Sequence, residues 1–360
     1  MKITELYLLN FKNYEERKFH FTGGFNAIVG KNGTGKTNLL DAVYLLCLTK
    51  SAFATTDSQN LKHKEQFFVV QGIFEQTENQ QTELQCSLQQ GKSKMMRVNK
   101  VAYPKVNQHI GKYPCVLITP YDTDLIREGS ETRRKFFDAT LCQASPHYLT
   151  DLLEYNQLLQ QRNSLLKQFA ERNYHDKTLL QVYTEKLLPL NQRIYLARKE
   201  AVENFTPIFQ QYYQEVASET ETVSLHYNSD LQNPNFELLF EQTLPKDLVL
   251  QRTNKGIHKD DYSFEINGFS ANRYGSQGQQ KSFVIALKLA QYEQLRRLKG
   301  FNPILLLDDI FDKLDGLRMA QLMRLLGKGN FGQVLLTDAN PERTKLLFEQ
   351  IGYDLQIIQL

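Results

Sequence analysis

Eight residues near the N-terminus have the types and the spacing of a loop that binds phosphate. The pattern G-x-x-x-x-G-K-[ST] is matched by Gly30, Lys31, Asn32, Gly33, Thr34, Gly35, Lys36 and Thr37. Glycines allow successive backbone N–H groups to turn toward phosphate oxygens, and the start of a following helix adds a favourable dipole. The pattern predicts that Lys36 neutralises the β- and γ-phosphates of a nucleotide and that the Thr37 hydroxyl binds Mg²⁺.

The neighbours of this loop favour a nucleotide site over a chance glycine-rich turn. Residues 25–29 are mostly apolar and predict a strand, and Leu39, Leu40, Val43 and Leu46 mark one face of a helix. Strand, loop and helix in this order are the context in which the pattern binds phosphate.

A second candidate group is a pair of carboxylates at the end of an apolar run. Residues 304–307 read Ile-Leu-Leu-Leu, and Asp308 and Asp309 follow directly. Ligands of open α/β sheets bind at the carboxyl ends of the strands. We therefore predict Asp308 as the Walker B ligand of Mg²⁺ and Asp309 as the group that orients or deprotonates water. An ordinary strand with a polar turn would look the same, so this interpretation depends on the loop upstream.

A third motif precedes the apolar face of another predicted helix. Ser276, Gly278 and Gln279 form a Ser-x-Gly-Gln pattern shortly before the Walker B strand. A serine at this position is often only a helix N-cap. The pattern also resembles the signature motif of ATP-binding-cassette ATPases, in which the serine and the helix N-terminus contact the γ-phosphate held on the opposite subunit.

The elements that must position these motifs are strands at both ends of the chain. Residues 3–11 predict a strand, residues 19–29 predict its partner, and further strand-like runs are residues 67–74, 84–88 and 115–119. After residue 221, strand-like runs alternate with helical ones, which predicts a parallel sheet covered by helices.

The middle of the chain has a different pattern. Apolar residues at steps of three and four mark one helix over residues 149–169 and a second over 183–212, with a turn at 172–176, which suggests an antiparallel helical arm. Pro189 and Pro207 predict bends or interruptions in the second helix. We expect an α/β fold in which a mixed sheet with helices is divided into residues 1–130 and 221–360, with a mainly helical domain, 131–220, inserted between them.

The composition is that of a globular protein without a strong overall charge. The chain has 360 residues, 41% of them hydrophobic, and 43 basic against 40 acidic residues give a net charge of +3. The four cysteines lack metal-ligand spacing and predict reduced thiols. No signal peptide and no apolar run of about 18 residues is present, so we expect a cytoplasmic protein with no membrane partner.

The order of the motifs resembles that of SMC-type ATPase heads, and several stretches resemble the RecF family of bacterial DNA repair proteins. Asp308-Asp309-Ile310-Phe311-Asp312-Lys313-Leu314-Asp315 is similar to the family's Walker B motif, which runs directly into its D-loop. Residues 6–14 resemble the family's N-terminal strand with its Asn-Phe-(Arg/Lys)-Asn-Tyr tag. Similar matches occur at residues 119–120, 128–130, 133–138 and 256–261, so the resemblance spans the whole chain.

The resemblance implies an ABC/SMC-type P-loop ATPase head that binds ATP and Mg²⁺. It implies an ATP-dependent homodimer in which Ser276, Gly278 and Gln279 of one copy meet the nucleotide of the other. It also implies binding to duplex DNA near single-strand junctions, loading of recombinase with RecO and RecR, and slow hydrolysis that acts as a switch. Asp312 stands where many members have Ser, and residues 50–56 lack a frequent Arg, which leaves contacts across the dimer and to the base open.

Three groups of basic residues are candidates for contact with DNA, because phosphate contacts need only Lys or Arg on accessible loops. For each group taken alone, an ordinary solvated surface is the favoured interpretation. The groups are Lys92, Lys94, Arg97, Lys100 and Lys105; Arg133, Arg134 and Lys135; and Arg252, Lys255, His258 and Lys259. For His258, a structural or phosphate-facing role is favoured over a catalytic one.

Two other functions remain open at this point. The protein could be a DNA-binding module that uses ATP only to hold a dimer together, and a Lys36→Arg variant separates this module from a hydrolytic switch. It could also be an SMC-related defence ATPase, but that function needs an added catalytic domain for which 360 residues leave no room.

Overall fold

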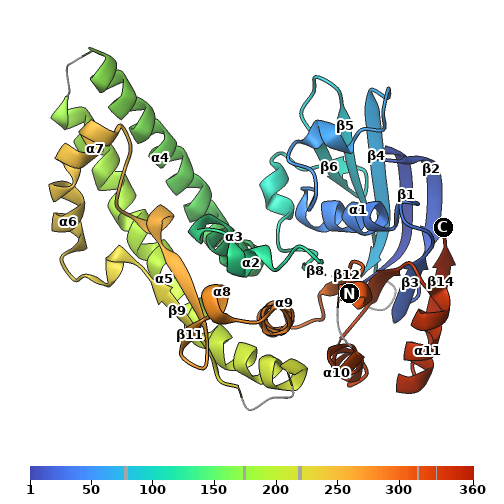
Figure 1. Cartoon of the computed structure of the whole chain (residues 1–360). Coiled ribbons are helices and arrows are strands. Elements are labelled where there is room, and N and C mark those ends of the chain that lie inside the picture. Colours follow the sequence, from blue (N-terminus) through green and yellow to red (C-terminus); the bar gives the residue numbers. More distant parts are fainter. Residues whose placement is uncertain (77–79, 173–175, 218–220, 314–315, 330) are drawn as a thin grey trace. The chain divides into compact units, whose positions relative to one another are not determined.

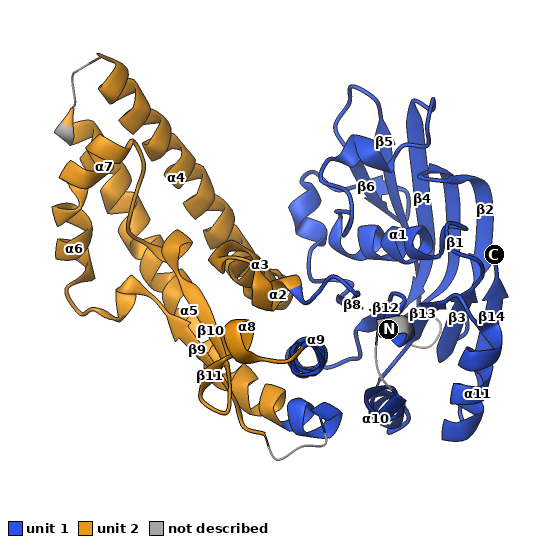
Figure 2. Ribbon diagram, viewed as in Figure 1, with its two compact units in different colours: residues 1–123, 211–220, 277–360 blue, residues 124–210, 221–276 orange. Residues whose placement is uncertain are grey.

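The computed structural model describes residues 1–76, 80–172, 176–217, 221–313, 316–329 and 331–360. These residues form two compact units (Figure 2). Unit 1 comprises Met1–Thr123, Gln211–Thr220 and Gln277–Leu360, and unit 2 comprises Asp124–Gln210 and Glu221–Ser276.

The first sheet of unit 1 is parallel and carries the phosphate loop. Its strand order is β14 (Leu355–Gln359), β3 (Phe25–Val29), β13 (Val334–Asp338), β12 (Ile304–Leu307) and β8 (Cys115–Ile118) (Figure 1). The residues of β3, β8, β12 and β13 are buried throughout, as their mostly apolar sequences require in a sheet covered on both faces. Since β3, β13 and β12 are neighbours, their carboxyl ends meet at one edge.

The second sheet of unit 1 is antiparallel. Its order is β2 (Tyr14–His20), β1 (Lys2–Phe11), β4 (Phe67–Glu75), β5 (Gln81–Gln89), β6 (Met95–Val98) and β7 (Val101–Ala102). The prediction of one partner strand over residues 19–29 is wrong, because β2 ends at His20 and β3 joins the parallel sheet. Gly23 and Gly24 lie between the two strands, where the chain passes from one sheet to the other.

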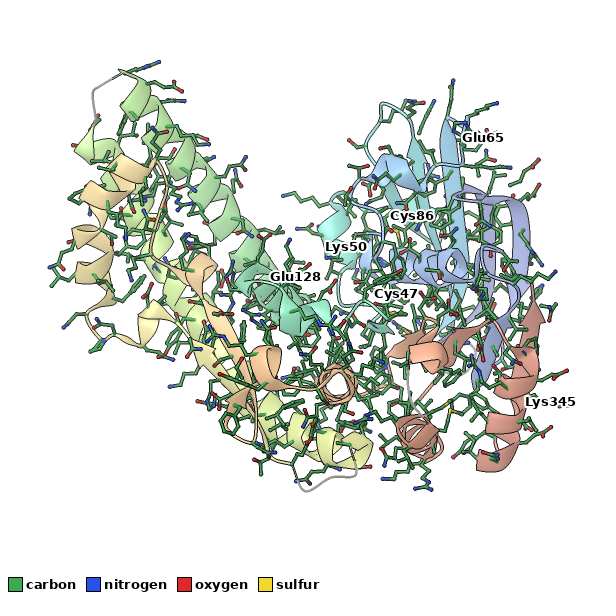
Figure 3. The ribbon with its side chains drawn as sticks, viewed as in Figure 1. Cys47, Lys50, Glu65, Cys86, Glu128 and Lys345 are labelled. Carbon is green, nitrogen blue, oxygen red and sulfur yellow. The ribbon has the colours of Figure 1, made fainter. Side chains whose placement is uncertain are left out.

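Helix α1 (Lys36–Leu48) contacts strands of both sheets and is buried along nearly its whole length. A helix that is apolar on most of its faces needs such a position. One core cluster joins α1 to both sheets, through residues such as Leu8, Leu46, Phe68 and Leu306. The thiols of Cys47 and Cys86 lie inside this unit (Figure 3), and both cysteines are free and buried.

A buried glutamine connects the two sheets of unit 1. Gln333 is 1% exposed. Its side-chain Nε2 donates to the carbonyl oxygens of Ile3 and Thr22, each at 2.7 Å, and its Oε1 accepts from the Ile3 N–H at 2.7 Å. If this side chain were apolar, the N–H and the carbonyl oxygen of Ile3 would lose these bonds, whereas the Thr22 carbonyl would keep the one that it accepts from Asn26 Nδ2 at 3.1 Å.

Replacement of Gln333 by Leu should therefore lower the free energy of unfolding by about 3 kcal/mol, because buried backbone groups would lose their hydrogen bonds. Urea unfolding followed by circular dichroism measures this. Gln356→Leu is the matched control, since Gln356 bonds to His20 and Thr22 in exposed positions where water can replace it. Equal losses for the two variants would contradict the role given to Gln333.

Helices α9 (Gln277–Lys299), α10 (Gly316–Leu326) and α11 (Pro341–Ile351) also belong to unit 1. The side chain of Asn340 caps α11 by accepting from the Arg343 N–H. None of the helices in the described ranges of the chain is long and apolar enough to cross a membrane.

Unit 2 is built on α2 (Asp124–Arg127), α3 (Ser130–Ala144) and two long helices, α4 (Pro146–Arg172) and α5 (Lys177–Ala217), and the end of α5 from Gln211 onward belongs to unit 1. An ion pair of 2.8 Å between Arg193 and Asp151 joins α4 and α5. Pro189 and Pro207 both lie inside α5 and neither ends it, so the predicted interruption is wrong. Buried side chains beside each proline, among them Leu187 and Ile208, stabilise the helix by packing. The predicted turn at 172–176 falls mostly on residues outside the described ones.

A small antiparallel sheet completes unit 2, in the order β11 (Phe269–Ser270), β10 (Asp261–Ile266) and β9 (Val223–Asn228). Unit 2 also contains the short helices α6 (Phe236–Gln242), α7 (Leu244–Leu250) and α8 (Ala271–Tyr274). The predicted division placed residues 221–276 in the ATPase head, whereas here they group with the helical segment. The physical reason is that β9 and β10 pair with each other and not with the sheets of unit 1.

Candidate nucleotide site

The phosphate loop runs from the end of β3 to the first turn of α1. Gly33 and Gly35 have φ angles of 83° and 105°, a region that side chains with a Cβ rarely adopt. Gly35 is also the N-cap residue of α1. The sequence thus places left-handed backbone where the loop must turn, and the helix N-terminus points into the turn.

Lys36 is held by the loop that it follows. Its Nζ donates to the carbonyl oxygens of Gly30 at 2.9 Å and Lys31 at 3.2 Å, and to Asn32 Oδ1 at 3.4 Å. Lys36 is only 4% exposed. These oxygens stand in for phosphate oxygens, so the ammonium group is already fixed inside the loop that would receive a triphosphate.

Thr37 and Asp308 come together from opposite ends of the chain. Thr37 Oγ1 lies 2.9 and 3.1 Å from the two carboxylate oxygens of Asp308. Burial raises the pKa of Asp308, and the negative charge of Asp309 raises it further, although bonds from Thr37 and Thr337 oppose this. A partly buried pair of a hydroxyl and a carboxylate offers oxygen ligands to a divalent cation, which would hold the carboxylate ionised.

Thr337 is a residue of this site that the sequence did not reveal. Its hydroxyl donates to Asp308 Oδ1 at 2.9 Å and accepts from the Asp309 N–H at 2.8 Å. Thr337 is fully buried at the end of β13, the strand between the phosphate loop and Asp308. It therefore fixes both carboxylate residues, but a threonine in an apolar strand carries no local signal of this role.

Asp309 has an unusual backbone, with a φ of 41°. This left-handed conformation is costly for a residue with a Cβ and is often found at functional sites. It is held by the bond from its N–H to Thr337. Of the D-loop stretch that follows, Leu314, Asp315 and the side chain of Asp312 lie outside the described residues.

The tag after β1 supports the phosphate loop from the side. Asn13 Nδ2 donates to the Thr34 carbonyl at 3.1 Å, and Tyr14 OH donates to the Gly35 carbonyl at 3.0 Å. Asn38 donates to Asn13 Oδ1 at 2.8 Å. A Cβ at position 35 would stand 2.5 Å from Asn13 Nδ2, so Gly35 is required by packing as well as by its φ. The family resemblance predicted this tag at the end of the N-terminal strand, but it did not predict the contact of the tag with the phosphate loop.

The segment after α1 is anchored to a buried carboxylate. Asp41 accepts from Ser51 Oγ at 2.6 Å, from the Ala52 N–H at 2.7 Å and from Lys12 Nζ. Lys12 Nζ also lies 5.7 Å from the centre of the Phe53 ring. Lys12, in the turn after β1, thus places a positive charge beside the segment that follows α1.

The signature motif lies at the start of α9. Ser276 is exposed and directly precedes the helix, and Gly278 and Gln279 lie in its first turn. The motif therefore has an exposed serine directly before a helix N-terminus, the arrangement that its predicted contact with a phosphate requires.

Comparisons with known proteins identify the family. The model of the RecF/RecN/SMC N-terminal domain matches residues 2–352. A "DNA replication and repair protein RecF" from Cytophaga hutchinsonii is 45% identical over 357 residues, covering 99% of this chain and 94% of that protein. The chain belongs to the RecF family. The RecF of Flavobacterium johnsoniae is also 45% identical, over the full length of both chains.

A solved structure of RecF shows the same fold. The structure, described as "recombination mediator protein RecF-ATP in RecFOR pathway", is 30% identical, with a TM-score of 0.87 over 94% of this chain and 92% of that one. The predicted fold class, an ABC/SMC-type P-loop head with an inserted and mainly helical second domain, is confirmed by the RecF family match and by this structure.

The basic groups of this RecF family member differ in what their cations already contact. In unit 2, Arg133 makes two hydrogen bonds to Asp261, at 2.8 and 3.1 Å, and Arg134 donates to the Asp260 carbonyl at 2.6 Å. Both arginines therefore stabilise unit 2 internally. Other members of the groups are exposed, namely Lys92, Lys100, Lys105, Lys135, Arg252 and Lys259.

His258 is a structural residue in unit 2. Its Nε2 lies 3.0 Å from the Thr253 carbonyl oxygen, and its Nδ1 lies 2.7 Å from Tyr155 OH. A carbonyl can only accept, so Nε2 carries the proton and Nδ1 accepts from Tyr155. Burial lowers the pKa of His258 to about 4, with smaller contributions that include the positive charges of Lys259 and Arg134. A neutral histidine with both nitrogens bonded has no atom left for phosphate.

This lowered pKa predicts acid sensitivity of unit 2. Below pH 6.5 the unfolded chain protonates His258 while the folded protein does not, so the free energy of unfolding falls as the pH goes from about 6.5 to about 4. His258→Gln should reduce that slope, as measured by urea unfolding at a series of pH values. The exposed His147, replaced in the same way, is the control, and an unchanged slope in His258→Gln would refute this assignment.

Proposed function

We propose that this protein binds ATP and Mg²⁺ at the loop of residues 30–37. The observation that carries the proposal is the meeting of Thr37 and Asp308 at 2.9 Å beside a Lys36 ammonium already held by loop oxygens. Thr37 and Asp308 would hold Mg²⁺, which when bound neutralises charge on the β- and γ-phosphate oxygens. The backbone N–H groups of residues 31–35 would surround the phosphates.

Hydrolysis would depend on Asp309. Its position directly after Asp308, with the backbone fixed by Thr337, suits a carboxylate that orients or deprotonates the attacking water. By the resemblance to the RecF family, we expect slow turnover that serves as a switch.

The second half of the site would come from another copy of the chain. The exposed Ser276 and the N-terminus of α9, with Gly278 and Gln279, would contact the triphosphate bound by the partner copy. ATP would thus close a homodimer, and hydrolysis would release it.

The closed dimer would bind DNA near junctions of duplex and single strand. The solved ATP-bound relative is described as a recombination mediator of the RecFOR pathway, and curated relatives are named for replication and repair. By this relationship the protein would act with RecO and RecR in loading recombinase at gaps, in the cytoplasm. Exposed lysines such as Lys92, Lys100 and Lys105 would meet the phosphate backbone.

Mixing two inactive variants tests the composite site. Lys36→Ala retains the signature motif and Ser276→Ala retains the phosphate loop, so each variant alone should form no ATP-dependent dimer and hydrolyse no ATP. A mixed dimer contains one intact site, and the mixture should regain measurable ATPase activity. If the mixture stays as inactive as its components, the trans contact of Ser276 is wrong.

A further inference from the structure

The guanidinium group of Arg318 lies against the first turn of the signature helix α9. Arg318 belongs to α10, and its Nε donates to Ser282 Oγ at 2.8 Å. A Cβ on Gly278 would stand 2.9 Å from Arg318 Nη2 and 3.0 Å from Nη1. Gly278 and Ser282 are four residues apart and so share one face of α9, which the guanidinium covers.

The contact with Arg318 gives a structural reason for a glycine at position 278. Its φ is not in the left-handed region, unlike those of Gly33 and Gly35, so the helical backbone would suit any L-residue. A side chain at position 278 would instead displace the guanidinium group. Ser282 is fully buried, so the hydrogen bond from Arg318 fixes a point inside unit 1.

We propose that Arg318 is a positioning residue for the signature motif. By filling the face left bare by Gly278 and bonding to Ser282, it fixes the first turn of α9 and thereby the helix N-terminus offered to a second copy. This inference rests on the proposed ATP-dependent dimer. Since α10 follows Asp308 and Asp309 along the chain, Arg318 also connects the acidic segment to the signature helix of the same chain.

The first test compares dimer formation with nucleotide binding in one variant. Arg318→Ala should weaken ATP-dependent dimerisation about 10-fold, as expected for loss of a hydrogen bond from a charged group. The affinity of the dilute monomer for a fluorescent ATP analogue should remain within about 2-fold of wild type, because the phosphate loop is untouched. Arg318→Lys retains the positive charge but not the planar guanidinium group. Its dimerisation should therefore be intermediate between that of the wild type and that of Arg318→Ala. Arg324→Ala, exposed on the same helix, is the matched control.

The second test is a double-mutant cycle with Gly278→Ala, which leaves Arg318 in the chain but displaces its guanidinium group. If Gly278 is needed for Arg318, this variant should lose dimerisation to the same degree as Arg318→Ala. The double variant should then be no weaker than either single one. If Gly278 is needed only so that a triphosphate can approach, the two losses will add, and the proposal is overturned.

The outcomes also separate this proposal from the function on which it rests. A wild-type protein that never dimerises with ATP refutes the proposed composite site. A wild-type protein that dimerises while Arg318→Ala dimerises equally well refutes only the role of Arg318. An equal fall in monomer nucleotide affinity would likewise refute it, because Arg318 would then act on its own chain's phosphate loop.

Discussion

Replacement of Asp309 by Asn should slow ATP hydrolysis by about 10²- to 10⁴-fold, the usual contribution of a positioned general base. The amide cannot take a proton from water, but its size preserves the backbone contact from the Asp309 N–H to Thr337 Oγ1. ATP binding should therefore persist, and the ATP-bound dimer should live longer. Single-turnover hydrolysis and dissociation of the dimer after dilution measure the two effects.

Asp354→Asn is a suitable control, because Asp354 is an exposed carboxylate before β14. If Asp309→Asn hydrolyses ATP at the wild-type rate, Asp309 is not the base. If the wild-type protein itself hydrolyses no ATP and still releases DNA, ATP serves only to hold the dimer together, and the non-hydrolysing module would replace the switch.

Replacement of Lys36 by Ala should weaken ATP binding by about 100-fold, which corresponds to about 3 kcal/mol for losing a buried, hydrogen-bonded charge partner. The structure already fixes its ammonium group through Gly30 and Lys31, so wild-type binding needs little further ordering of this side chain. Titration of a fluorescent ATP analogue measures the loss.

The fold should survive this change, because two of the three loop oxygens that lose a donor belong to the exposed residues Lys31 and Asn32, where water can replace it. Lys345→Ala is the matched control for removing one positive charge, because Lys345 is an exposed residue of α11 (Figure 3). Undiminished ATP affinity in Lys36→Ala, with the protein folded, would show that the loop does not bind the nucleotide as described.

The phosphate loop could be predicted from sequence because all its determinants are contiguous. Glycines at the left-handed positions, Lys36 and Thr37 lie within eight residues, between a strand and a helix. Asp308 and Asp309 were recognisable for the same reason, since they end a short apolar strand. A sequence pattern can reveal a site whose residues are neighbours along the chain.

Contacts between distant segments could not be predicted in this way. Thr337 reaches Asp308 only because β13 lies between β3 and β12. Gln333, which precedes β13 of the parallel sheet, bonds to Ile3 on β1 of the antiparallel sheet. The grouping of residues 221–276 with the helical unit follows from the pairing of β9 with β10, which no local pattern specifies. Pro189 and Pro207 locally disfavour a continuous helix, but the packing around α5 overrides this preference.

The charged residues of unit 2 show a similar limit. Arg133, Arg134 and His258 have the composition of a phosphate-binding surface, yet Asp261, the Asp260 carbonyl and Tyr155 already bind them. Composition counts charges, whereas the fold decides which charges remain available to a ligand.

Light scattering of the purified protein with ATP, with ADP and with no nucleotide tests the central claim most directly. We predict a doubled mass with ATP alone, since the γ-phosphate is the group that would join the phosphate loop of one copy to Ser276 of the other. A protein that binds ATP and keeps the mass of a single chain under all three conditions would contradict the account.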